Sequence, residues 1–532
     1  MSRVRGYARP VITRDDLQRD LVTDSVTFVE THISWVLLHE REVFKIKKPV
    51  EMGFLDFSSV ERRKHACERE VELNRRLAPD VYLGVIPVRK AAGKLSLGEE
   101  GEIVDWAVHM RRLDDRDRAD VRLAEGRLTA TDITRVAKTL VDFHANARSD
   151  EETARFGQPE AIAVNVRENF TQTAASLGRY VSPAQASELA EGQLAHLERH
   201  AARFTARAEA GRVRDGHGDL RLEHVYLSDD GSITVLDCIE FNDRFRYADV
   251  ASDLAFLAMD LSAHGHVELG EHLVAEYAKH SGDFDLYGVL DFYEGYRAFV
   301  RGKIAAFVAD DSRVDMAHRS RAAASARRCF MLALATGRKA LLDPSVVAVG
   351  GVIASGKSTV SGRLSLEMSA PVVDADRTRK QMIGVRATQP VHDGSWQGAY
   401  DPKFTEEVYA EVFRRAGVVL QSGRPVLVDA SFRSRALRGR ARALAAAHDV
   451  PFRLVECRVD YALAKERLRE RAKRASVSDG RLEIFDDFVA KWETIDEFPA
   501  DEHVVLDTSQ PLDSTIDRLR AAVQTWPSGL DQ

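Results

Sequence analysis

Glycine, lysine and hydroxyl residues at a fixed spacing follow a short apolar run in the stretch 346–359, VVAVGGVIASGKST. Short Val-rich runs closed by glycines are typical of strands buried on both faces of a sheet. The glycines allow successive N–H groups to point at a phosphate where a helix begins; the lysine can reach the β- and γ-phosphates, and the serine can hold Mg²⁺. The sequence therefore predicts a phosphate-binding loop. Its residues are Gly351, Gly356, Lys357, Ser358 and Thr359.

Two aspartates flank a predicted hairpin in the stretch 217–242, HGDLRLEHVYLSDDGSITVLDCIEFN. A Ser-Asp-Asp-Gly turn separates two short strands, so that Asp219 precedes the hairpin and Asp237 follows it. A hairpin brings both carboxylates to the same end of the ribbon, where one could orient a hydroxyl and the other could hold Mg²⁺. The alternative is that each aspartate is only a turn residue, which is commoner for an aspartate taken singly.

Two lysines in VFKIKKPV lie on one face of a predicted strand, because side chains alternate along a strand. This strand and the one before it, at 33–38, flank a polar turn as in a hairpin. A lysine held over a cleft is a good partner for α- and β-phosphates, whereas a solvated strand face explains the segment equally well on its own. Whether Lys45 or Lys47 would contact phosphate stays open.

A helix is predicted after these strands, because Ser58 and Glu61 have the spacing of a capping box and Pro79 ends the segment. Glu70 lies on this helix. Further antiparallel strands up to about residue 113 complete a small lobe of five strands and one helix, and the periodicity beyond it is mostly helical.

The composition is that of an ordinary globular protein: of 532 residues, 44% are hydrophobic and 30% are charged, enough for two to four domains. A net charge of -7 argues against a general nucleic-acid binder. The four cysteines contain no Cys-x-x-Cys pair, which disfavours a zinc site or a disulfide framework and fits a reducing cytoplasm. No stretch has the pattern of a membrane span or a signal peptide, so we expect a cytoplasmic protein without membrane contact.

The first part of the chain, from about residue 26 to 342, resembles the aminoglycoside phosphotransferase family of small-molecule kinases, which are relatives of the protein kinases. The His-Gly-Asp-Leu and Leu-Asp motifs carry the resemblance. It implies that Asp219 is the catalytic base and Asp237 a metal ligand, with Glu70 as the ion-pair glutamate and Lys47 as the best match for its lysine partner. The chain departs from the family in lacking a glycine-rich loop before the lysine and in carrying His224 where the family has a metal-binding Asn.

His224 allows two interpretations. An imidazole nitrogen binds Mn²⁺ or Zn²⁺ more readily than Mg²⁺, so a ligand role would change the metal preference. Alternatively, His224 donates a hydrogen bond to Asp219 or to a nearby carbonyl and holds the loop without touching metal.

Beyond the phosphate-binding loop, short apolar strands alternate with helical segments, which predicts a doubly wound parallel sheet with its active site at the carboxyl ends of the strands. The spacing Asp376-x-x-Arg379 and the ending VLVDASF resemble P-loop kinases of the gluconate kinase, polynucleotide kinase and zeta-toxin group. The resemblance implies that Asp376 is the base for an acceptor hydroxyl, Arg379 its partner, and Asp429 a carboxylate near Mg²⁺.

A basic helix, ALAKERLRERAKR, places Arg467, Arg471 and Arg474 on one face. A lid helix that clamps a triphosphate would use such a face, because the planar guanidinium bonds two oxygens at once. A solvated face is the alternative. No platform of base-stacking aromatic residues accompanies it, so a nucleic-acid acceptor is not supported.

We therefore predict an α+β protein-kinase-like bilobal domain at 1–342, with a small lobe at about 26–110 and a large lobe at about 111–342. An α/β P-loop domain with a doubly wound parallel sheet follows at 343–532. Each domain is expected to bind ATP with Mg²⁺, or with Mn²⁺ as an alternative, and to transfer a γ-phosphoryl group to a hydroxyl of a small molecule. The competing hypothesis is that one or both domains are non-catalytic ATP-binding regulatory modules, and His224 makes this most credible for the first. Neither the acceptors nor the oligomeric state can be read from the sequence.

Overall fold

The computed structural model describes residues 12–51, 55–98, 100–336, 342–515 and 519. Contacts divide the chain into two compact units. Unit 1 comprises residues 1–135, 142–162 and 204–257, and unit 2 comprises residues 136–141, 163–203 and 258–532. Among the described residues, no helix combines the length and the apolarity that crossing a bilayer requires.

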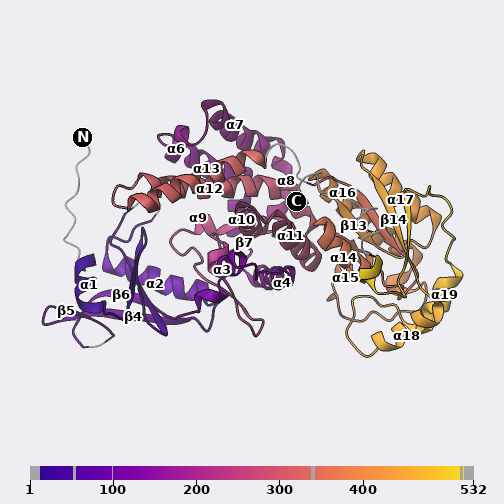
Figure 1. The fold of residues 1–532 in the computed structure, drawn as a ribbon, viewed down its shortest axis with the longest axis horizontal. Helices are drawn as coiled ribbons and strands as arrows, with labels where there is room; N and C mark the ends of the chain where they lie inside the picture. Colours follow the sequence, from indigo (N-terminus) through magenta and orange to yellow (C-terminus); the bar gives the residue numbers. More distant parts are fainter. Residues whose placement is uncertain (1–11, 52–54, 99, 337–341, 516–518, 520–532) are drawn as a thin grey trace. The chain divides into compact units, whose positions relative to one another are not determined.

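Unit 1 is built on an antiparallel sheet of six strands in the order β1-β2-β3-β6-β4-β5. Strands β4, β5 and β6 of this sheet are labelled in Figure 1. Helix α2, Val60–Asn74, packs on β4 and β6 through a core that includes Cys67, Val71 and Val108. The strands are β1 Thr27–Glu30, β2 Ser34–Leu38, β3 Glu42–Lys47, β4 Tyr82–Ala91, β5 Lys94–Leu97 and β6 Glu102–Arg111.

The small lobe differs from the prediction in two details. Strand β1 and helix α1, Arg14–Leu21, add to the predicted five strands and one helix. The capping residue of α2 is Ser59, whose hydroxyl accepts a hydrogen bond from the Arg62 N–H, so the predicted capping box at Ser58 is one residue early. Ser58 instead donates to the carboxylate of Asp56.

The remainder of unit 1 carries two short two-stranded sheets. Strands β8, Val225–Leu227, and β9, Ile233–Val235, form the predicted hairpin, with Val225 opposite Val235. Strands β7, Val213–Asp215, and β10, Tyr247–Asp249, pair just before and after it. The helical elements of this part are α3 Ala119–Ala124, α4 Ala130–Asn146, α5 Glu151–Ala154, α8 Ala201–Glu209, α9 Asp243–Arg246 and α10 Val250–Ala263; α4, α8 and α10 each include some residues of unit 2.

Unit 2 contains a helical part. Helices α12 and α13 pack along each other, and Phe299 and Phe330 meet edge to face between them. Arg297 of α12 is only 5% exposed, so its guanidinium is buried within this helical part. The helices are α6 Pro159–Thr173, which begins in unit 1, and α7 Pro183–Arg199, α11 Val267–Ser281, α12 Leu290–Asp310 and α13 Met316–Ala335.

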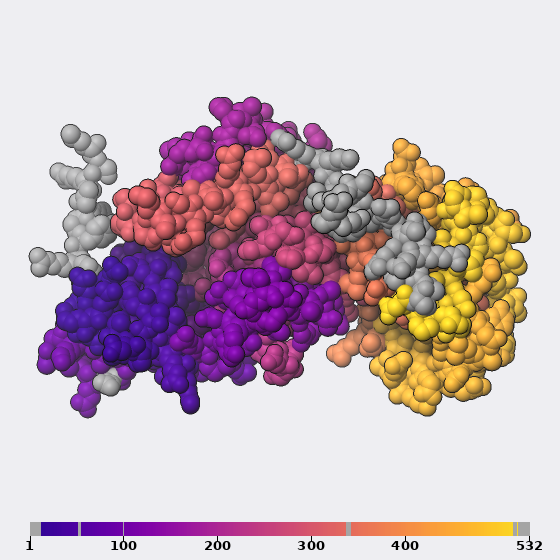
Figure 2. Space-filling view, viewed as in Figure 1, coloured from indigo at the N-terminus to yellow at the C-terminus, as the bar shows by residue number. Residues whose placement is uncertain are grey.

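Unit 2 also contains the predicted parallel sheet, with the strand order β12-β13-β11-β14-β15. Strand β11 is buried along its whole length, as the apolar run predicted. In Figure 2 the part of the chain that contains this sheet is coloured orange to yellow. The strands are β11 Val346–Gly350, β12 Val372–Asp374, β13 Val426–Asp429, β14 Phe452–Arg458 and β15 His503–Asp507; the helices are α14 Lys357–Met368, α15 Ala375–Met382, α16 Pro402–Gln421, α17 Arg435–Ala447, α18 Tyr461–Arg471 and α19 Phe485–Ala490.

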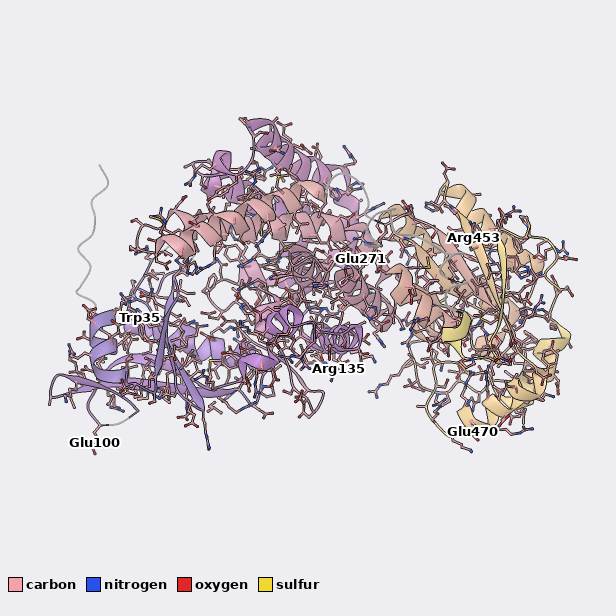
Figure 3. All side chains as sticks on the ribbon, in the orientation of Figure 1. Trp35, Glu100, Arg135, Glu271, Arg453 and Glu470 are labelled. Atoms are coloured by element: carbon pink, nitrogen blue, oxygen red, sulfur yellow. The ribbon has the colours of Figure 1, made fainter. Side chains whose placement is uncertain are left out.

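A buried ion-pair cluster joins the sheet part of unit 2 to its helical part. Arg424, between α16 and β13, is 7% exposed and lies 2.7 Å from Glu271 of α11 (labelled in Figure 3) and 2.9 Å from Asp291 of α12. Its guanidinium also lies over the ring of Tyr287. Burial raises the pKa of the neighbouring Glu294 to about 8, which keeps that carboxyl mostly neutral at pH 7. The domain boundary predicted at residue 343 falls between residues that the contacts place in one unit, and it stays a prediction.

Candidate functional sites

The first candidate site lies in unit 1, where Lys45 of β3 meets two carboxylates. Its ammonium is 3.0 Å from Glu70 of α2 and 2.5 Å from Asp237, which follows the β8–β9 hairpin. Although removal from water opposes it, the Lys45 ammonium holds the pKa of Asp237 well below its usual range, so the carboxylate is ionised. A lysine and a carboxylate side by side, with the lysine 15% exposed, can hold phosphates and a divalent metal ion together.

Lys47 has a different environment. Its side chain is fully buried, and its ammonium is paired with Glu70 and with Glu240. The ring of Phe57 lies 5.5 Å from the same ammonium. Of the two lysines, Lys45 is therefore the one next to Asp237, while Lys47 neutralises buried carboxylates behind it. Glu240 was not predicted from the sequence, where its only signal is its place in LDCIEFN, three residues after Asp237.

Asp253 of α10 holds the loop that carries Asp219 in place. The Asp253 carboxylate accepts hydrogen bonds from the N–H groups of His217, at 2.7 Å, and Gly218, at 2.9 Å. Gly218 has φ +85°, and a Cβ there would lie 2.8 Å from the carbonyl oxygen of Phe245, so only glycine fits. The Asp219 carboxylate is held by two hydrogen bonds from the Arg221 guanidinium, at 3.1 and 3.0 Å.

His224 uses both ring nitrogens within this loop. Nδ1 lies 2.8 Å from the carbonyl oxygen of Asp219, and Nε2 lies 3.1 Å from the Arg221 guanidinium, so Nδ1–H donates and Nε2 accepts. Burial lowers the pKa of His224 to about 4, helped by Arg221, so the ring is neutral at pH 7. Nε2 also lies 3.9 Å from Asp237. These contacts match the interpretation in which His224 holds the loop.

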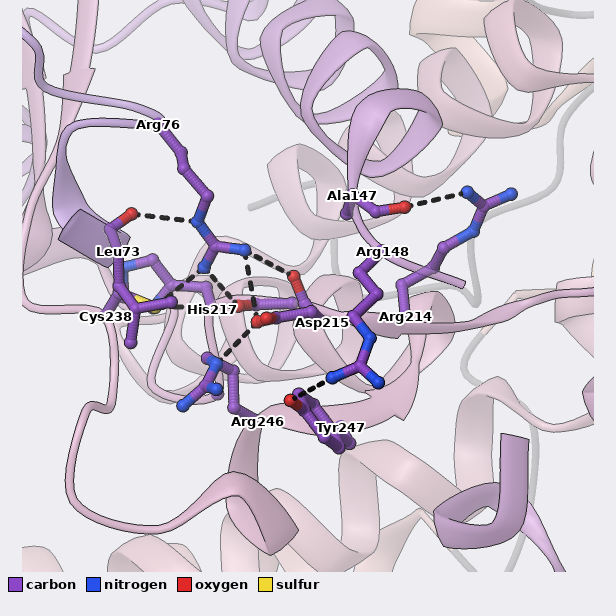
Figure 4. A network of polar contacts seen from close by, with 12 residues as sticks. Leu73, Arg76, Ala147, Arg148, Arg214, Asp215, His217, Cys238, Arg246 and Tyr247 are labelled. Carbon is purple, nitrogen blue, oxygen red and sulfur yellow. Dashed lines mark hydrogen bonds and ion pairs between the residues drawn. The ribbon is translucent and has the colours of Figure 1, made fainter. Parts of the chain in front are cut away.

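Behind the loop, two arginines converge on Asp215 of β7. Arg76, just after α2, donates to the Asp215 carbonyl, at 2.8 Å, and to its carboxylate, at 3.1 Å. It also donates to the carbonyl of Gly216 and to the sulfur of Cys238. The fully buried Arg246 donates to the same carboxylate at 2.5 Å, and Figure 4 shows both guanidiniums directed at Asp215. Arg76 thus connects the C-terminal end of α2, the helix that carries Glu70, to Gly216 before Asp219 and to Cys238 after Asp237.

The second candidate site lies in unit 2, where the phosphate-binding loop joins β11 to α14. A Cβ at Gly351, which has φ +148°, would lie 2.6 Å from the Cys457 carbonyl, so the close approach of β14 requires glycine. Gly356, with φ +86°, is the N-terminal capping residue of α14. Lys357 curls back over the loop, and its ammonium donates to the carbonyls of Gly351, at 3.1 Å, and Val352, at 2.9 Å. The predicted order of strand, glycine-containing loop and helix is present here.

Three aspartates gather beside this loop at the carboxyl ends of β12 and β13, where Asp374 and Asp429 are register partners. Asp374, which the sequence analysis did not single out, accepts a hydrogen bond from the Arg377 N–H at 2.6 Å and so caps α15. Burial raises the pKa of Asp374 to about 7, with Asp429 and Asp376 adding to the shift. Burial also raises the pKa of Asp429, with Lys357 opposing. This concentration of carboxylates suits a divalent cation.

A pocket of about 150 Å³ connects these groups. It is lined by the phosphate-binding loop, by Asp429, by residues of α15, by Trp396 and by Phe488 of α19. The predicted residues that line it are Gly356, Lys357, Ser358, Thr359, Asp376, Arg379, Asp429 and Arg471.

The predicted arginines have different roles. Arg379 donates to the Ala399 carbonyl and to Thr405, and lies over the Tyr400 ring at 4.6 Å; no direct bond between it and Asp376 is found among the described residues. Arg467 donates to the Thr508 carbonyl at 2.7 Å and to the carbonyl of Ala354, in the phosphate-binding loop, at 3.5 Å. Arg471 lines the pocket, whereas Arg474 lies beyond the end of α18 and is exposed.

In the part of the chain that the structure describes, no three His, Cys, Asp or Glu side chains converge closely enough to hold a metal ion by themselves. A metal ion at either site would therefore take part of its ligands from phosphate oxygens and water, which is usual for Mg²⁺. Asp237 in unit 1, and Ser358 with Asp429 in unit 2, are oxygen ligands of the required type.

Comparison with known families defines the class of the protein. Residues 43–293 match the model of the phosphotransferase enzyme family, and residues 346–495 match an AAA domain model. The chain thus joins a phosphotransferase domain of the protein-kinase-like fold to a P-loop kinase domain, and the predicted fold class is confirmed. Such kinases are phosphotransferases that in general use ATP and a divalent metal ion.

Two curated relatives cover almost the whole chain. Uncharacterised proteins of Mycobacterium bovis and Mycobacterium tuberculosis are each 32% identical over 476 residues, covering 87% of this chain and 90% of theirs. The chain belongs to the same family as these mycobacterial proteins.

Solved structures similar to separate parts of the chain include two kinds of kinase. A gluconokinase from Sinorhizobium meliloti 1021 is 21% identical, covers 35% of this chain and 93% of its own, and has a TM-score of 0.25. A structure described as a putative aminoglycoside phosphotransferase, from Ralstonia eutropha JMP134, is 14% identical, covers 59% of this chain and 92% of its own, and has a TM-score of 0.35.

Proposed function

We propose that both sites are ATP-dependent phosphotransferases that transfer a γ-phosphoryl group to a hydroxyl of a small molecule. The observation that carries the proposal is the pocket of unit 2, because Lys357 of the phosphate-binding loop and Asp376 of α15 line the same cavity. A phosphate-binding group and a base that face one another are what phosphoryl transfer requires.

In unit 2, the loop N–H groups and Lys357 would hold the β- and γ-phosphates, and Asp376 would accept the proton of the acceptor hydroxyl. The acceptor oxygen then forms a bond to the γ-phosphorus, and the bond from that phosphorus to the β,γ-bridging oxygen breaks, leaving ADP. Ser358 and Asp429 would hold Mg²⁺, which supplies positive charge to the phosphate oxygens.

In unit 1, Lys45 would contact the phosphates, Asp237 would hold the metal ion, and Asp219 would accept the hydroxyl proton. Lys45 replaces Lys47 in this proposal because Lys47 is fully buried between two glutamates. His224 is kept as a residue that holds the loop.

A second function is favoured for unit 1 by one observation. The Asp219 carboxylate is bonded at both oxygens by Arg221, and a carboxylate so engaged is a weak base. Unit 1 could then bind ATP as a regulatory module without transferring phosphate. ADP release by the full chain carrying Lys357→Ala, measured with a panel of sugars, amino sugars and nucleosides and with Mg²⁺ or Mn²⁺, separates the two functions. Turnover stimulated by an acceptor supports a kinase, and tight binding without turnover supports a module.

The cytoplasmic location is likewise proposed, and it is supported by the cysteines. All four are free and buried, as expected in a reducing compartment.

Asp219 and Asp237 should fail in different ways when each is changed to Asn in the Lys357→Ala chain. Asp219→Asn should slow transfer by about 100-fold or more while ATP still binds, because a general base contributes only to the chemical step. Asp237→Asn should weaken Mg²⁺-dependent ATP binding by about tenfold or more, because a charged metal ligand is lost. Single-turnover kinetics and calorimetry measure the two effects. Equal loss of binding in both variants would contradict this division of roles.

The two lysines provide a matched pair. Lys45→Met should weaken ATP binding by about tenfold or more and leave the fold stable, since Lys45 lies at the accessible end of the cluster. Lys47→Met should lower the free energy of unfolding by about 3–5 kcal/mol, because it leaves Glu240 buried without its cation. Denaturant titration and ATP titration of both variants test this. A stable Lys47→Met chain that no longer binds ATP would reverse the assignment.

A further inference from the structure

The unit 2 pocket also contains an arginine held by aromatic rings. Arg433 lies 4.2 Å from the ring centroid of Trp396 and 5.7 Å from that of Phe488, and these two rings are stacked at 4.8 Å. All three residues line the pocket. Cation–π contact at these distances holds a guanidinium by its face.

Arg433 differs from its neighbours in having no carboxylate partner. Among the described residues, no ion pair or hydrogen bond of its side chain is found, whereas Arg435 pairs with Asp496 and Arg438 with Glu497. Two carboxylates, Glu406 and Glu493, act electrostatically on Arg433 from a distance. Both have other partners, because Glu406 pairs with Arg440 and Glu493 accepts a hydrogen bond from the Arg435 N–H.

The loop that presents Trp396 is strained and tethered. Trp396 has φ +63°, a backbone conformation that bulky residues rarely adopt. Asp393 accepts the Ala399 N–H at 2.7 Å, and Ser395 donates to Asp487 of α19 at 2.6 Å. Strain that persists because surrounding contacts enforce it is typical of ligand sites. The fold therefore enforces the position of the ring on which Arg433 rests.

Three guanidiniums line this pocket, and no ion pair between any of them and a carboxylate is found among the described residues. Arg379 is 5% exposed, and its Nε is buried without a hydrogen-bond partner. Arg471 has no carboxylate partner within ion-pair distance among the described residues, although Asp376 lies near enough to act on its pKa. Burial lowers the pKa of Arg433, and Arg379 adds to this effect. Like charges so placed are stabilised by a bound anion.

We propose that the acceptor of the unit 2 site carries an anionic group, a carboxylate or a phosphate, which Arg433 binds while Asp376 takes the proton of the reacting hydroxyl. A guanidinium stacked by its face keeps the N–H groups of its edge available, and this planar fork matches two oxygens of either anion. The inference rests on the phosphotransferase function proposed for unit 2 and specifies its class of substrate.

The test uses the full chain saturated with Mg²⁺ and a non-hydrolysable ATP analogue, so that the phosphate-binding loop is filled. Calorimetry then measures the binding of inorganic phosphate, D-glycerate, sn-glycerol 3-phosphate and glycerol. We expect at least one anionic probe to bind and glycerol not to bind measurably. Preference for glycerate or for glycerol 3-phosphate identifies the anion as carboxylate or phosphate.

Arg433→Gln should weaken the binding of the anionic probe by about 10–100-fold, which is the loss expected when a charged hydrogen-bond donor is removed. Arg435→Gln, two residues away and already paired with Asp496, is the control and should bind the probe as the unchanged chain does. Arg433→Lys keeps the positive charge but loses the planar pair of N–H donors, so it should bind the probe with intermediate affinity. This variant replaces Arg433→Gln in the test if the Gln variant does not fold.

Three results would overturn the inference: no anionic probe binds, glycerol binds as well as the anions, or Arg433→Gln binds the anion unchanged. None of these concerns the nucleotide. Failure of the chain to bind the ATP analogue would instead contradict the proposed function, and the loss of anion binding in Arg433→Gln can still be measured without the analogue.

Discussion

Lys357→Ala is expected to remove nucleotide binding from the unit 2 site, with an affinity loss of about 100-fold or more. The ammonium would make charge-assisted hydrogen bonds to both the β- and the γ-phosphate, each contributing about 1.5–3 kcal/mol. Its hydrogen bonds to described residues are to two loop carbonyls, which it can exchange for phosphate oxygens. The stoichiometry of analogue binding to the full chain should fall from two to one.

Calorimetry on the full chain measures this, with unit 1 as an internal reference whose affinity should not change if the sites are independent. Lys403→Ala, at an exposed position of α16, is the matched control for loss of a lysine. Unchanged stoichiometry and affinity in the Lys357 variant would refute the assignment of the phosphate-binding loop.

Arg424→Ala is expected to lower the free energy of unfolding of unit 2 by about 3–5 kcal/mol, because removing one partner of a buried ion pair leaves uncompensated charge. Two carboxylates, Glu271 and Asp291, lose their cation at once. With Glu294 mostly protonated at pH 7, the cluster has one cation for these two anions, so no other charge replaces it.

Arg414→Ala is the control, because Arg414 also pairs across the same part of unit 2, with Asp285 at 2.7 Å, but both side chains are about half exposed. An exposed pair contributes about 0–1 kcal/mol, so this variant should change stability little. Denaturant titration followed by tryptophan fluorescence, fitted for more than one transition, measures both. If both variants lowered the free energy of unfolding by similar small amounts, burial would not determine the strength of the Arg424 cluster.

The elements that the sequence predicted best are those fixed by local pattern. The strand and loop from Val346 to Thr359 and the hairpin between Asp219 and Asp237 follow from apolar runs, glycine spacing and turn residues that lie close together in the chain. Helix starts are less exact, as the shift from Ser58 to Ser59 shows, because adjacent serines offer the same capping group.

The features that the sequence could not predict depend on distant partners. Alternation places Lys45 and Lys47 on one face, and only Glu240, 193 residues beyond Lys47, determines which lysine is buried. Arg467 and Arg471 share a predicted helix face, yet Arg467 donates to the Thr508 carbonyl, whereas Arg471 lines the pocket. In the sequence, Asp374 is only the last residue of a predicted strand. Its place beside Asp429 follows from the register of β12 and β13, which the sequence does not show.

The division of the chain into two units has a consequence for its synthesis on the ribosome. All of unit 1 has left the ribosome soon after residue 257, because its three segments end there, whereas unit 2 needs segments from residue 136 to the parallel sheet. At typical rates of about 5–20 residues per second, the remaining 275 residues take on the order of tens of seconds. Helices α6 and α7 of unit 2 must spend that interval without the sheet part of their unit. Chaperones can reach both helices during that interval, and synonymous changes that slow decoding beyond residue 257 would lengthen it.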